Sequence, residues 1–297
     1  MKAACFRRFG GPEVLEIDEL PEPRPGPGRI RIAVRAAGVN ASDWKKRAGL
    51  MDPGLPQTLG HEAAGVVDAL GEGVADAAVG DRVFGFADGP TAQAELAVLT
   101  HYAPMPPSLD FAEAATLPAA VETATRALDR LGPGTPLLVN GASGSVGAAA
   151  VQLAAARGTR VIGTASPANH EYLRALGAEP VAYGEGLADR VRALAPHGVG
   201  AALDVAGSGI LPELIDLAGG PEHVVTIADF AGAAAHGVVF SKGEDGRALH
   251  AIGEIGALIE AGRFRPPPVR TFRLDEIAEA HRAGEAGGSR AKIVLVP

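Results

Sequence analysis

The middle of the chain alternates between two kinds of segment. Longer segments rich in Ala, Leu, Glu and Arg, which are typical of helices, separate short apolar runs, which are typical of buried strands. The predicted strands are PLLVN, RVIGTA, GAALDVAG, HVVTIA and GVVF. This alternation predicts a parallel sheet with crossover helices, a doubly wound α/β domain, over residues 118–240.

The residues on either side of this region have another pattern. Residues 1–117 contain short β-like runs that Pro and Gly divide, among them RIRIAVRAAGVN, EAAGVVDAL and DRVFGFA. Residues 241–297 mix helical spacing in RALHAIGEIGALIEAGRF and DEIAEAHRAGEAG with extended runs in PPPVRTFRL and AKIVLVP. We expect small strands joined by irregular turns in the first part, and helices mixed with strands in the last.

Composition and charge narrow the class of protein. The chain has 297 residues and a net charge of -8, whereas nucleic-acid binders usually present a basic face, so nucleic acid is not an expected partner. Cys5 is the only cysteine, which excludes an intramolecular disulfide and a multi-cysteine zinc site. We find no signal peptide pattern and no apolar stretch of about 18 residues. We expect a soluble cytoplasmic protein that acts on a small molecule, without a membrane partner.

A glycine-rich stretch, GASGSVG, follows the first strand of the middle region directly and opens a helix. Gly141 and Ala142 permit a tight turn, Gly144 lets the backbone approach a pyrophosphate, and Gly147 allows close contact between helix and strand. The N–H groups at the helix start then face the anion. Such a turn alone is equally typical of a purely structural loop, but the strand before it and the strand RVIGTA after the helix favour a dinucleotide.

The end of the second strand of this region indicates which dinucleotide binds. NAD binders usually carry Asp or Glu there for the ribose hydroxyls, whereas this chain has GTASPANH, with Ala165 and Ser166. The hydroxyl of Ser166 can donate a hydrogen bond to a 2′-phosphate. The sequence therefore favours NADPH over NADH, although a polar surface loop without a ligand has the same composition.

Seven motifs, in this order and at this spacing, resemble the medium-chain dehydrogenase/reductase superfamily, in its zinc-independent quinone oxidoreductase and enoyl reductase branch. They are AAGVNASDW, GHEAAGVV, GDRVFGF, TLPAAVETATRAL, GASGSVGAAAVQLA, VIGTAS and EAHRAGEAGGSRAKIVLV. The resemblance implies an α/β architecture in which residues 1–117 and 241–297 form a GroES-like β domain. Residues 118–240 then form the inserted Rossmann domain that binds NADP.

The resemblance also bears on metal binding. It aligns the catalytic zinc ligands of zinc-dependent relatives with Asn40, His61 and Ala119, of which only the histidine can bind a metal. A catalytic zinc needs three protein ligands of N, S or carboxylate type, and neither an amide nor a methyl group replaces a thiolate. Asp43 and Glu62 can in principle rebuild a site around His61, but supporting carboxylates are the commoner interpretation. We expect no metal.

Without a metal, hydrogen bonds must polarise the carbonyl of the acceptor while NADPH delivers a hydride. The resemblance implies that Asn40 lies beside the nicotinamide and the substrate oxygen, where its amide can donate. Asp43, Lys45 and His61 are candidates for a proton relay to the product. For Lys45 the alternative is a solvated helix face, and for His61 it is a satisfied interior histidine.

The expected cofactor site combines the glycine-rich turn with the ends of later strands and with positions that the resemblance implies, such as Thr123 near the nicotinamide. The predicted residues are Asn40, Thr123, Ala142, Ser143, Gly144, Ser145, Val146, Gly147, Thr164, Ser166, Tyr183 and Ala228.

The sequence therefore predicts an NADPH-dependent oxidoreductase of the quinone reductase or enoyl reductase type, acting on quinones or conjugated enones. Two alternatives stay open: an enoyl or ketone reductase specific to one biosynthetic pathway, and a non-catalytic NADPH-binding sensor. The short segment ADGPTAQ indicates an open site for flat substrates, and the resemblance implies a homodimer that pairs through HGVVFS.

Overall fold

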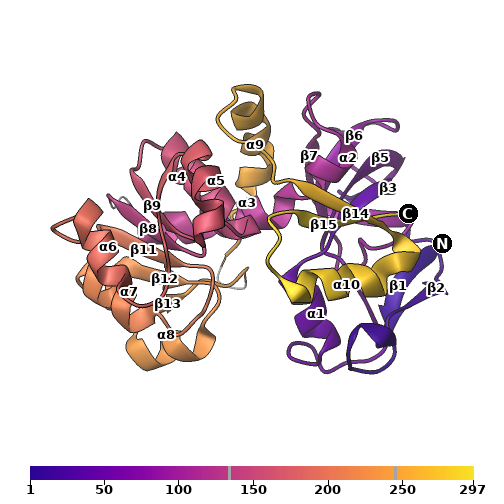
Figure 1. The fold of residues 1–297 in the computed structure, drawn as a ribbon. Coiled ribbons are helices and arrows are strands. Elements are labelled where there is room, and N and C mark those ends of the chain that lie inside the picture. Colours follow the sequence, from indigo (N-terminus) through magenta and orange to yellow (C-terminus); the bar gives the residue numbers. More distant parts are fainter. Residues whose placement is uncertain (133–134, 244–245) are drawn as a thin grey trace. The chain divides into compact units, whose positions relative to one another are not determined.

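The computed structural model describes residues 1–132, 135–243 and 246–297, and the chain divides into two compact units (Figure 1). Unit 1 comprises residues 1–119, 252–260 and 265–297. Unit 2 comprises residues 120–251 and 261–264. The predicted domain borders at 117/118 and 240/241 stay predictions. The two units are defined by contacts within the chain, whereas the predicted borders are those of the family's domains.

Unit 2 is built on a six-stranded parallel sheet in the order β10-β9-β8-β11-β12-β13. The chain enters at the centre, runs to one edge and then returns to the centre before it runs to the other edge. Every apolar run predicted as a strand contains one, which confirms the doubly wound fold. The strands are β8 (Leu137–Asn140), β9 (Val161–Thr164), β10 (Ala178–Val181), β11 (Ala201–Asp204), β12 (Val224–Thr226) and β13 (Val239–Phe240).

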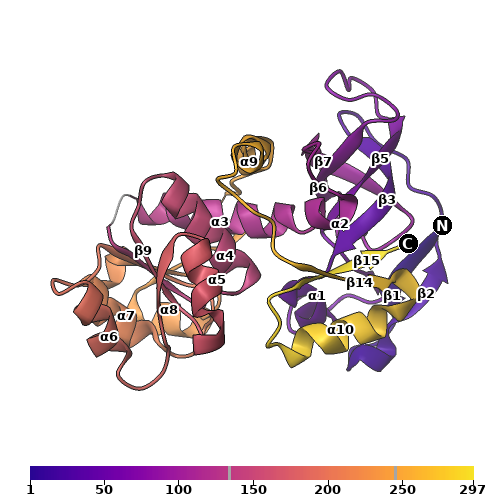
Figure 2. The same ribbon diagram turned by 45° about the horizontal axis from the view of Figure 1, so that its top comes forward.

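Helices cover this sheet and bury its apolar side chains. On one face, α6, α7 and α8 pack against a buried cluster that includes Leu138, Ile162, Val191, Leu214 and Val224 (Figures 1 and 2). The helices of this region are α3 (Leu117–Leu131), α4 (Ser145–Ala156), α5 (His170–Ala175), α6 (Leu187–Leu194), α7 (Leu211–Ala218) and α8 (Phe230–His236). Short 3-10 turns, η2 (Pro167–Asn169) and η3 (Pro221–His223), precede α5 and β12.

Unit 1 contains the chain ends and is mainly β, as predicted (Figure 2). Its larger sheet has the order β14-β15-β3-β5-β6-β7, and β7 also pairs with β3, so that part of the sheet closes on itself. A smaller sheet has the order β2-β1-β4. The strands are β1 (Lys2–Phe6), β2 (Glu16–Glu19), β3 (Ile30–Gly38), β4 (Gln57–Thr58), β5 (Glu62–Leu70), β6 (Arg82–Ala87), β7 (Leu96–Pro104), β14 (Val269–Arg273) and β15 (Lys292–Val296).

Four helices and two 3-10 turns complete unit 1: α1 (Ala41–Arg47), α2 (Phe111–Ala114), α9 (His250–Glu260), α10 (Ile277–Ala286), η1 (Pro12–Val14) and η5 (Leu274–Glu276). A buried cation joins α1 to α10. Arg47, only 2% exposed, donates to the Gly10 carbonyl at 3.0 Å and to Nδ1 of His281 at 3.0 Å, and it pairs with Glu285 at 2.5 Å. Because burial and the Arg47 charge both disfavour the imidazolium, the pKa of His281 falls to about 3.

The register of unit 1 brings three distant parts of the sequence to one end of its larger sheet. β5 runs antiparallel to β3 with Ala37 opposite Ala63, which puts Glu62 opposite Gly38. β15 runs antiparallel to β3 with Val294 opposite Gly38, which puts Lys292 opposite Asn40. Since residues two apart on a strand share a face, the side chains at these positions point to the same side.

No helix among the described residues has the length and apolar content that crossing a lipid bilayer requires.

Candidate active site

The glycine-rich turn of unit 2 follows β8 and leads into α4. Gly141 has φ +82°, a left-handed conformation that favours glycine. A Cβ at Gly147 would lie 2.3 Å from the Gly141 carbonyl oxygen, so a side chain there has no room. At Gly144 the nearest protein atom to such a Cβ lies 3.6 Å away, an ordinary contact. The chain itself therefore needs glycine at 141 and 147, whereas at 144 the protein alone leaves room for a side chain.

This turn offers hydrogen-bond donors. α4 begins at Ser145, so the N–H groups of its first turn have no acceptor within the helix. They carry the positive end of the helix dipole. Gly144 is exposed, and Ser145 and Val146 are half-buried, so the start of the helix is accessible. A pyrophosphate fits this arrangement, and the residues predicted to hold it are together in one turn.

A row of buried side chains runs across the carboxyl ends of four adjacent strands. The Thr164 hydroxyl donates to Oδ1 of Asn140 at 2.8 Å, and Asn140 Nδ2 donates to Oδ1 of Asp204 at 2.9 Å. The Thr226 hydroxyl donates to Oδ2 of Asp204 at 2.7 Å. All four side chains are at most 3% exposed. The hydrogen bonds thus connect β9, β8, β11 and β12 in their spatial order.

This row also holds the loops that follow the strands. The Thr164 hydroxyl accepts from the Gly141 N–H at 2.9 Å. Asp204 accepts from the N–H groups of Ala206 and Gly207, and the Thr226 hydroxyl accepts from those of Ala228 and Asp229. The predicted cofactor residues Thr164 and Ala228 therefore belong to one network, in which buried Thr164 supports the turn through its side chain.

The loop after β9 carries the predicted NADP-selecting residues. Asn169 Nδ2 donates to the Ser143 hydroxyl at 3.4 Å and to the Ser166 hydroxyl at 3.3 Å, which joins the glycine-rich turn to this loop. Tyr183 follows β10, the neighbouring strand, and its side chain is 61% exposed. No carboxylate occupies the position directly after β9, which is Ala165, and its side chain is buried.

Thr123 lies on α3, beside a buried ion pair. Its hydroxyl donates to Glu122 at 3.3 Å, and Glu122 binds Arg126 at 2.8 Å. Glu122 also accepts from the Ala248 N–H at 3.1 Å, and Arg126 donates to Ser241 at 2.7 Å. Glu122 is therefore part of a local structural network.

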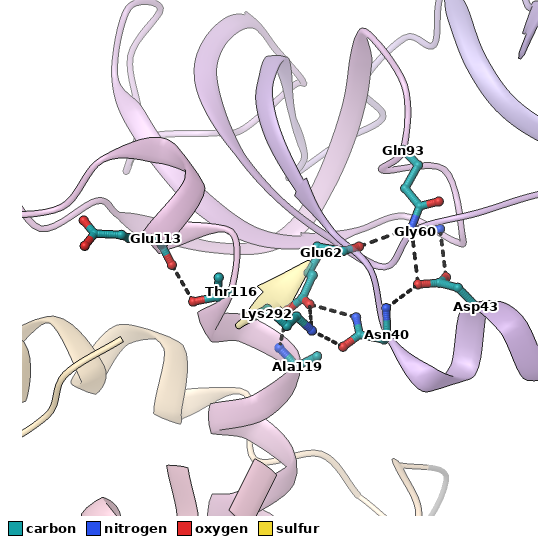
Figure 3. Close-up of polar contacts among 10 residues, drawn as sticks. Asn40, Asp43, Gly60, Glu62, Gln93, Glu113, Thr116, Ala119 and Lys292 are labelled. Atoms are coloured by element: carbon teal, nitrogen blue, oxygen red, sulfur yellow. Dashed lines mark hydrogen bonds and ion pairs between the residues drawn. The ribbon is translucent and has the colours of Figure 1, made fainter. Parts of the chain in front are cut away.

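In unit 1, Asn40, Glu62 and Lys292 form a polar cluster at the end of the sheet (Figure 3). Asn40 Nδ2 donates to Glu62 Oε1 at 2.7 Å, and Lys292 Nζ lies 3.0 Å from the same oxygen. Lys292 also donates to Asn40 Oδ1. The second carboxylate oxygen of Glu62 accepts from the Ala119 N–H at 2.7 Å, at the start of α3.

Asp43 lies next to this cluster, on the first turn of α1. Its carboxylate accepts from the Asn40 N–H at 2.7 Å, from the Gly60 N–H at 3.2 Å and from Gln93 Nε2 at 3.2 Å. Complete burial raises the pKa of Asp43, while the hydrogen bonds from the backbone of Asn40 and Gly60 and the charges of His61 and Lys292 act against the rise. These contacts are those of a carboxylate that holds α1 against the turn at Gly60.

The other two predicted catalytic residues lie in different surroundings. The side chain of His61 is half-buried at the start of β5, beside Glu62. The side chain of Lys45 is exposed on α1. The structure therefore groups Asn40, Asp43 and His61 in one region, and places Lys45 on the outer surface of the helix.

The residues of this region do not suit a metal ion. Among the described residues, no group of three or more His, Cys, Asp or Glu side chains is arranged to hold one. At Glu62, the neighbours are an ammonium group and two N–H donors, which repel a cation.

Sequence reasoning missed Lys292 and Gln93. Lys292 opens the run KIVLV, whose other members are apolar, and this isolated charge in a buried strand is the signal that marked it. Glu62 was considered as a metal ligand or a supporting carboxylate, but not as a partner of Asn40. Gln93 lies in a segment that was interpreted as a short loop, and nothing in its neighbours distinguishes it.

Two family models match the chain. The alcohol dehydrogenase GroES-like domain matches residues 26–118, and the zinc-binding dehydrogenase model matches residues 176–295. Among curated proteins, the spectinabilin polyketide synthase system protein NorB of Streptomyces orinoci is 36% identical over 289 residues, covering 91% of this chain and 13% of NorB. The chain thus spans a small part of this much longer relative.

Solved structures of similar length match as well. A mycobacterial protein in complex with NADPH is 27% identical, with a TM-score of 0.85 and complete coverage of both chains. The quinone oxidoreductase of Coxiella burnetii is 30% identical, with a TM-score of 0.83, and the match covers 100% of this chain and 99% of that one. On these matches, the chain belongs to the alcohol dehydrogenase superfamily, in the quinone oxidoreductase branch of the medium-chain dehydrogenases/reductases.

Proposed function

We propose that this protein is a metal-independent reductase that uses NADPH to reduce quinones or conjugated enones. The observation that carries the proposal is the cluster of Asn40, Glu62 and Lys292, which supplies a hydrogen-bond donor where the zinc-dependent relatives hold a metal. When bound, NADPH supplies the hydride. The residues of the chain bind the cofactor, orient the acceptor and stabilise the charge that develops on its oxygen.

Unit 2 supports the cofactor part of the proposal. Gly144 leaves an accessible backbone before the donors of α4, which suits a pyrophosphate. Ser143 and Ser166 present hydroxyls that Asn169 joins, and a hydroxyl can donate to a 2′-phosphate. A carboxylate at position 165 or 166 would repel that phosphate, and none is present. NADPH is therefore the proposed cofactor.

Unit 1 supports the acceptor part. The amide nitrogen of Asn40 has two N–H bonds, of which Glu62 accepts one. In the proposal, the second donates to the acceptor oxygen, and it strengthens as that oxygen becomes negative during hydride transfer. The enolate or hydroquinone anion then collects a proton, for which half-buried His61 is the proposed donor. In the proposal, Asp43 has a structural role, since all the hydrogen bonds that it accepts come from protein groups.

A second candidate function is enoyl reduction in one biosynthetic pathway. The match to the polyketide synthase protein NorB, which covers 91% of this chain, favours it. Both functions use the same chemistry, because an enoyl thioester is an acceptor conjugated with a carbonyl. They differ in breadth: a general quinone reductase accepts many acceptors, and a pathway enzyme accepts few.

The test is NADPH oxidation, followed by absorbance, with a quinone, an enone, an enoyl thioester and a simple ketone. NADH serves as the cofactor control and EDTA as the metal control. We expect turnover of the quinone or enone that EDTA does not change and that is faster with NADPH. Turnover confined to the thioester indicates the pathway enzyme. Tight NADPH binding without any turnover contradicts the proposal and indicates the non-catalytic sensor.

We also propose a homodimer that forms by pairing of β13, the last strand in the sheet order of unit 2. Val239 on this strand is 41% exposed, and an edge strand offers unpaired backbone groups. Light scattering at micromolar concentration is expected to give twice the mass of one chain for the natural sequence. Val239→Lys, which puts a charge on the edge strand, is expected to give a monomer with its NADPH affinity unchanged, and a monomer for the natural sequence contradicts the proposal.

A further inference from the structure

The side-chain amide of Asn40 is held at both ends by groups of fixed hydrogen-bonding character. A carboxylate such as Glu62 only accepts, and an ammonium such as Lys292 only donates. The nitrogen of the amide must therefore face Glu62, and its oxygen must face Lys292. In the flipped orientation, two donors would meet at Lys292 and two acceptors at Glu62.

We propose that Glu62 and Lys292 are positioning residues, which fix the orientation of the Asn40 amide so that its second N–H points to the acceptor oxygen. The inference rests on the proposed function and adds two residues to it. Asn40 is the group that contacts the substrate, whereas Glu62 and Lys292 act through it. A hydrogen-bond donor with one orientation needs no reorganisation when charge develops on the oxygen, and this lowers the barrier.

The surroundings of Glu62 and Lys292 keep both side chains in place. Glu62 is fully buried and Lys292 is 4% exposed, so water does not compete for their hydrogen bonds. The other oxygen of Glu62 is held by the N–H of Ala119, in the first turn of α3. Gly38, opposite Glu62 in the sheet, leaves the space that the carboxylate needs, since a Cβ there would lie 2.3 Å from Glu62 Oε1.

The ammonium group also polarises the amide. The single buried charge of Lys292 is balanced by the carboxylate of Glu62. The ammonium of Lys292 donates to the oxygen of the Asn40 amide and so polarises this amide toward the substrate. Polarisation of an amide in this direction makes its N–H groups better donors.

The kinetic test compares Lys292→Met with the natural protein in single-turnover oxidation of bound NADPH by a quinone. We expect the rate of hydride transfer to fall at least tenfold while the dissociation constant of NADPH stays within twofold. In an Asn40→Ala background, Lys292→Met is expected to have no further effect, because it acts through that amide. Lys46→Met is the matched control: Lys46 is 7% exposed, and its ammonium donates to the Thr58 carbonyl at 3.2 Å instead of to the Asn40 amide.

Since Lys292→Met leaves Glu62 as an unpaired buried charge, the variant is accompanied by Glu62→Gln/Lys292→Met, which removes both charges. We expect this double variant to fold and to keep the slow hydride transfer. Folded variants whose hydride-transfer rate stays within twofold of the natural protein overturn the inference.

A second readout does not depend on activity. The chain has three asparagines, Asn40, Asn140 and Asn169, so ¹⁵N-asparagine labelling gives three side-chain amide signals, and Asn40→Ala assigns the one of interest. We expect Lys292→Met to speed the exchange of the Asn40 amide protons with water and to leave the buried Asn140 signal unchanged. An unchanged rate of exchange of the Asn40 amide protons with water overturns the inference. If the natural protein reduces no acceptor, the proposed function fails, and this comparison still decides whether Lys292 positions Asn40.

Discussion

Asp204→Asn tests whether the row of buried side chains holds the cofactor loops of unit 2. Asp204 is fully buried and accepts four hydrogen bonds, three at Oδ1 and one at Oδ2. Asparagine has nearly the same shape, but its amide nitrogen would take the place of one of these oxygens. If the oxygen stays with the three donors, the new N–H groups face the Thr226 hydroxyl.

The cost follows from the partners of Thr226. Its hydroxyl oxygen already accepts from the N–H groups of Ala228 and Asp229, so its own proton has only Asp204 as acceptor. In the variant, that proton and an amide proton are both left without an acceptor in a buried place. A buried unsatisfied group costs about 1–3 kcal/mol, and a hydrogen bond to a charged group contributes about 1.5–3 kcal/mol. We expect a loss of about 3 kcal/mol in the free energy of unfolding of unit 2.

The assay is urea unfolding followed by two signals. Far-UV circular dichroism follows the helices of both units, whereas fluorescence follows Trp44, the only tryptophan, which lies in unit 1. We expect the unfolding transition followed by circular dichroism to show the lower free energy of unfolding. We also expect about tenfold weaker NADPH binding, because the loops at 206–207 and 228–229 lose their support. Adding Thr226→Val to the variant is expected to cost less than Thr226→Val alone.

Asp216→Asn is the matched control. Asp216 pairs with Arg192 at 2.5 Å on the surface, where its side chain is 66% exposed. Exposed ion pairs contribute at most about 1 kcal/mol, so this variant is expected to keep its stability and its NADPH affinity. If Asp204→Asn costs less than 1 kcal/mol or no more than the control, the row does not hold the loops and the reasoning is refuted.

Three further predictions follow from single contacts. Gly144→Ala is expected to weaken NADPH binding at least tenfold at unchanged stability, whereas Gly147→Ala, with its Cβ 2.3 Å from a carbonyl oxygen, is expected to lose stability by calorimetry. Since the pKa of His281 is lowered from 6.5 to about 3, its stabilising contribution is complete above about pH 6.5 and is lost as the pH falls toward 3. Urea titrations are expected to show a slope of roughly 1.4 kcal/mol per pH unit that His281→Gln removes. Gly38→Ala is expected to displace Glu62 and to slow hydride transfer in the single-turnover assay, with NADPH affinity unchanged.

Local patterns were sufficient to predict most of the fold. The strands of unit 2 are apolar runs bounded by polar segments, and burial on both faces of a parallel sheet produces that pattern. The turn at Gly141 and Gly147 was predicted for the correct physical reasons, since the left-handed φ of the first and the close contact of the second are visible in the structure. Asn40 was identified only through the family resemblance.

The partners of Asn40 could not be predicted in the same way, because they depend on strand register. Lys292 follows Asn40 by more than two hundred residues, and only the pairing of β15 with β3 sets them opposite each other. A shift of one residue would turn the lysine to the other face of the sheet. The sequence does contain a signal, which is a charged residue at the start of an apolar strand. This signal does not indicate which residue the lysine contacts.

Register also explains how the buried charge of Glu62 is balanced. Asn40 and Glu62 are fixed by β3 and β5, and the Ala119 N–H is fixed by the start of α3, whatever side chains those positions carry. The carboxylate of Glu62 is fully buried, and an unpaired buried charge is strongly destabilising. Lys292 on β15 supplies the missing positive charge from within the chain. The identities of residues 62 and 292 are therefore coupled, because a neutral side chain at position 292 would leave the Glu62 carboxylate unpaired.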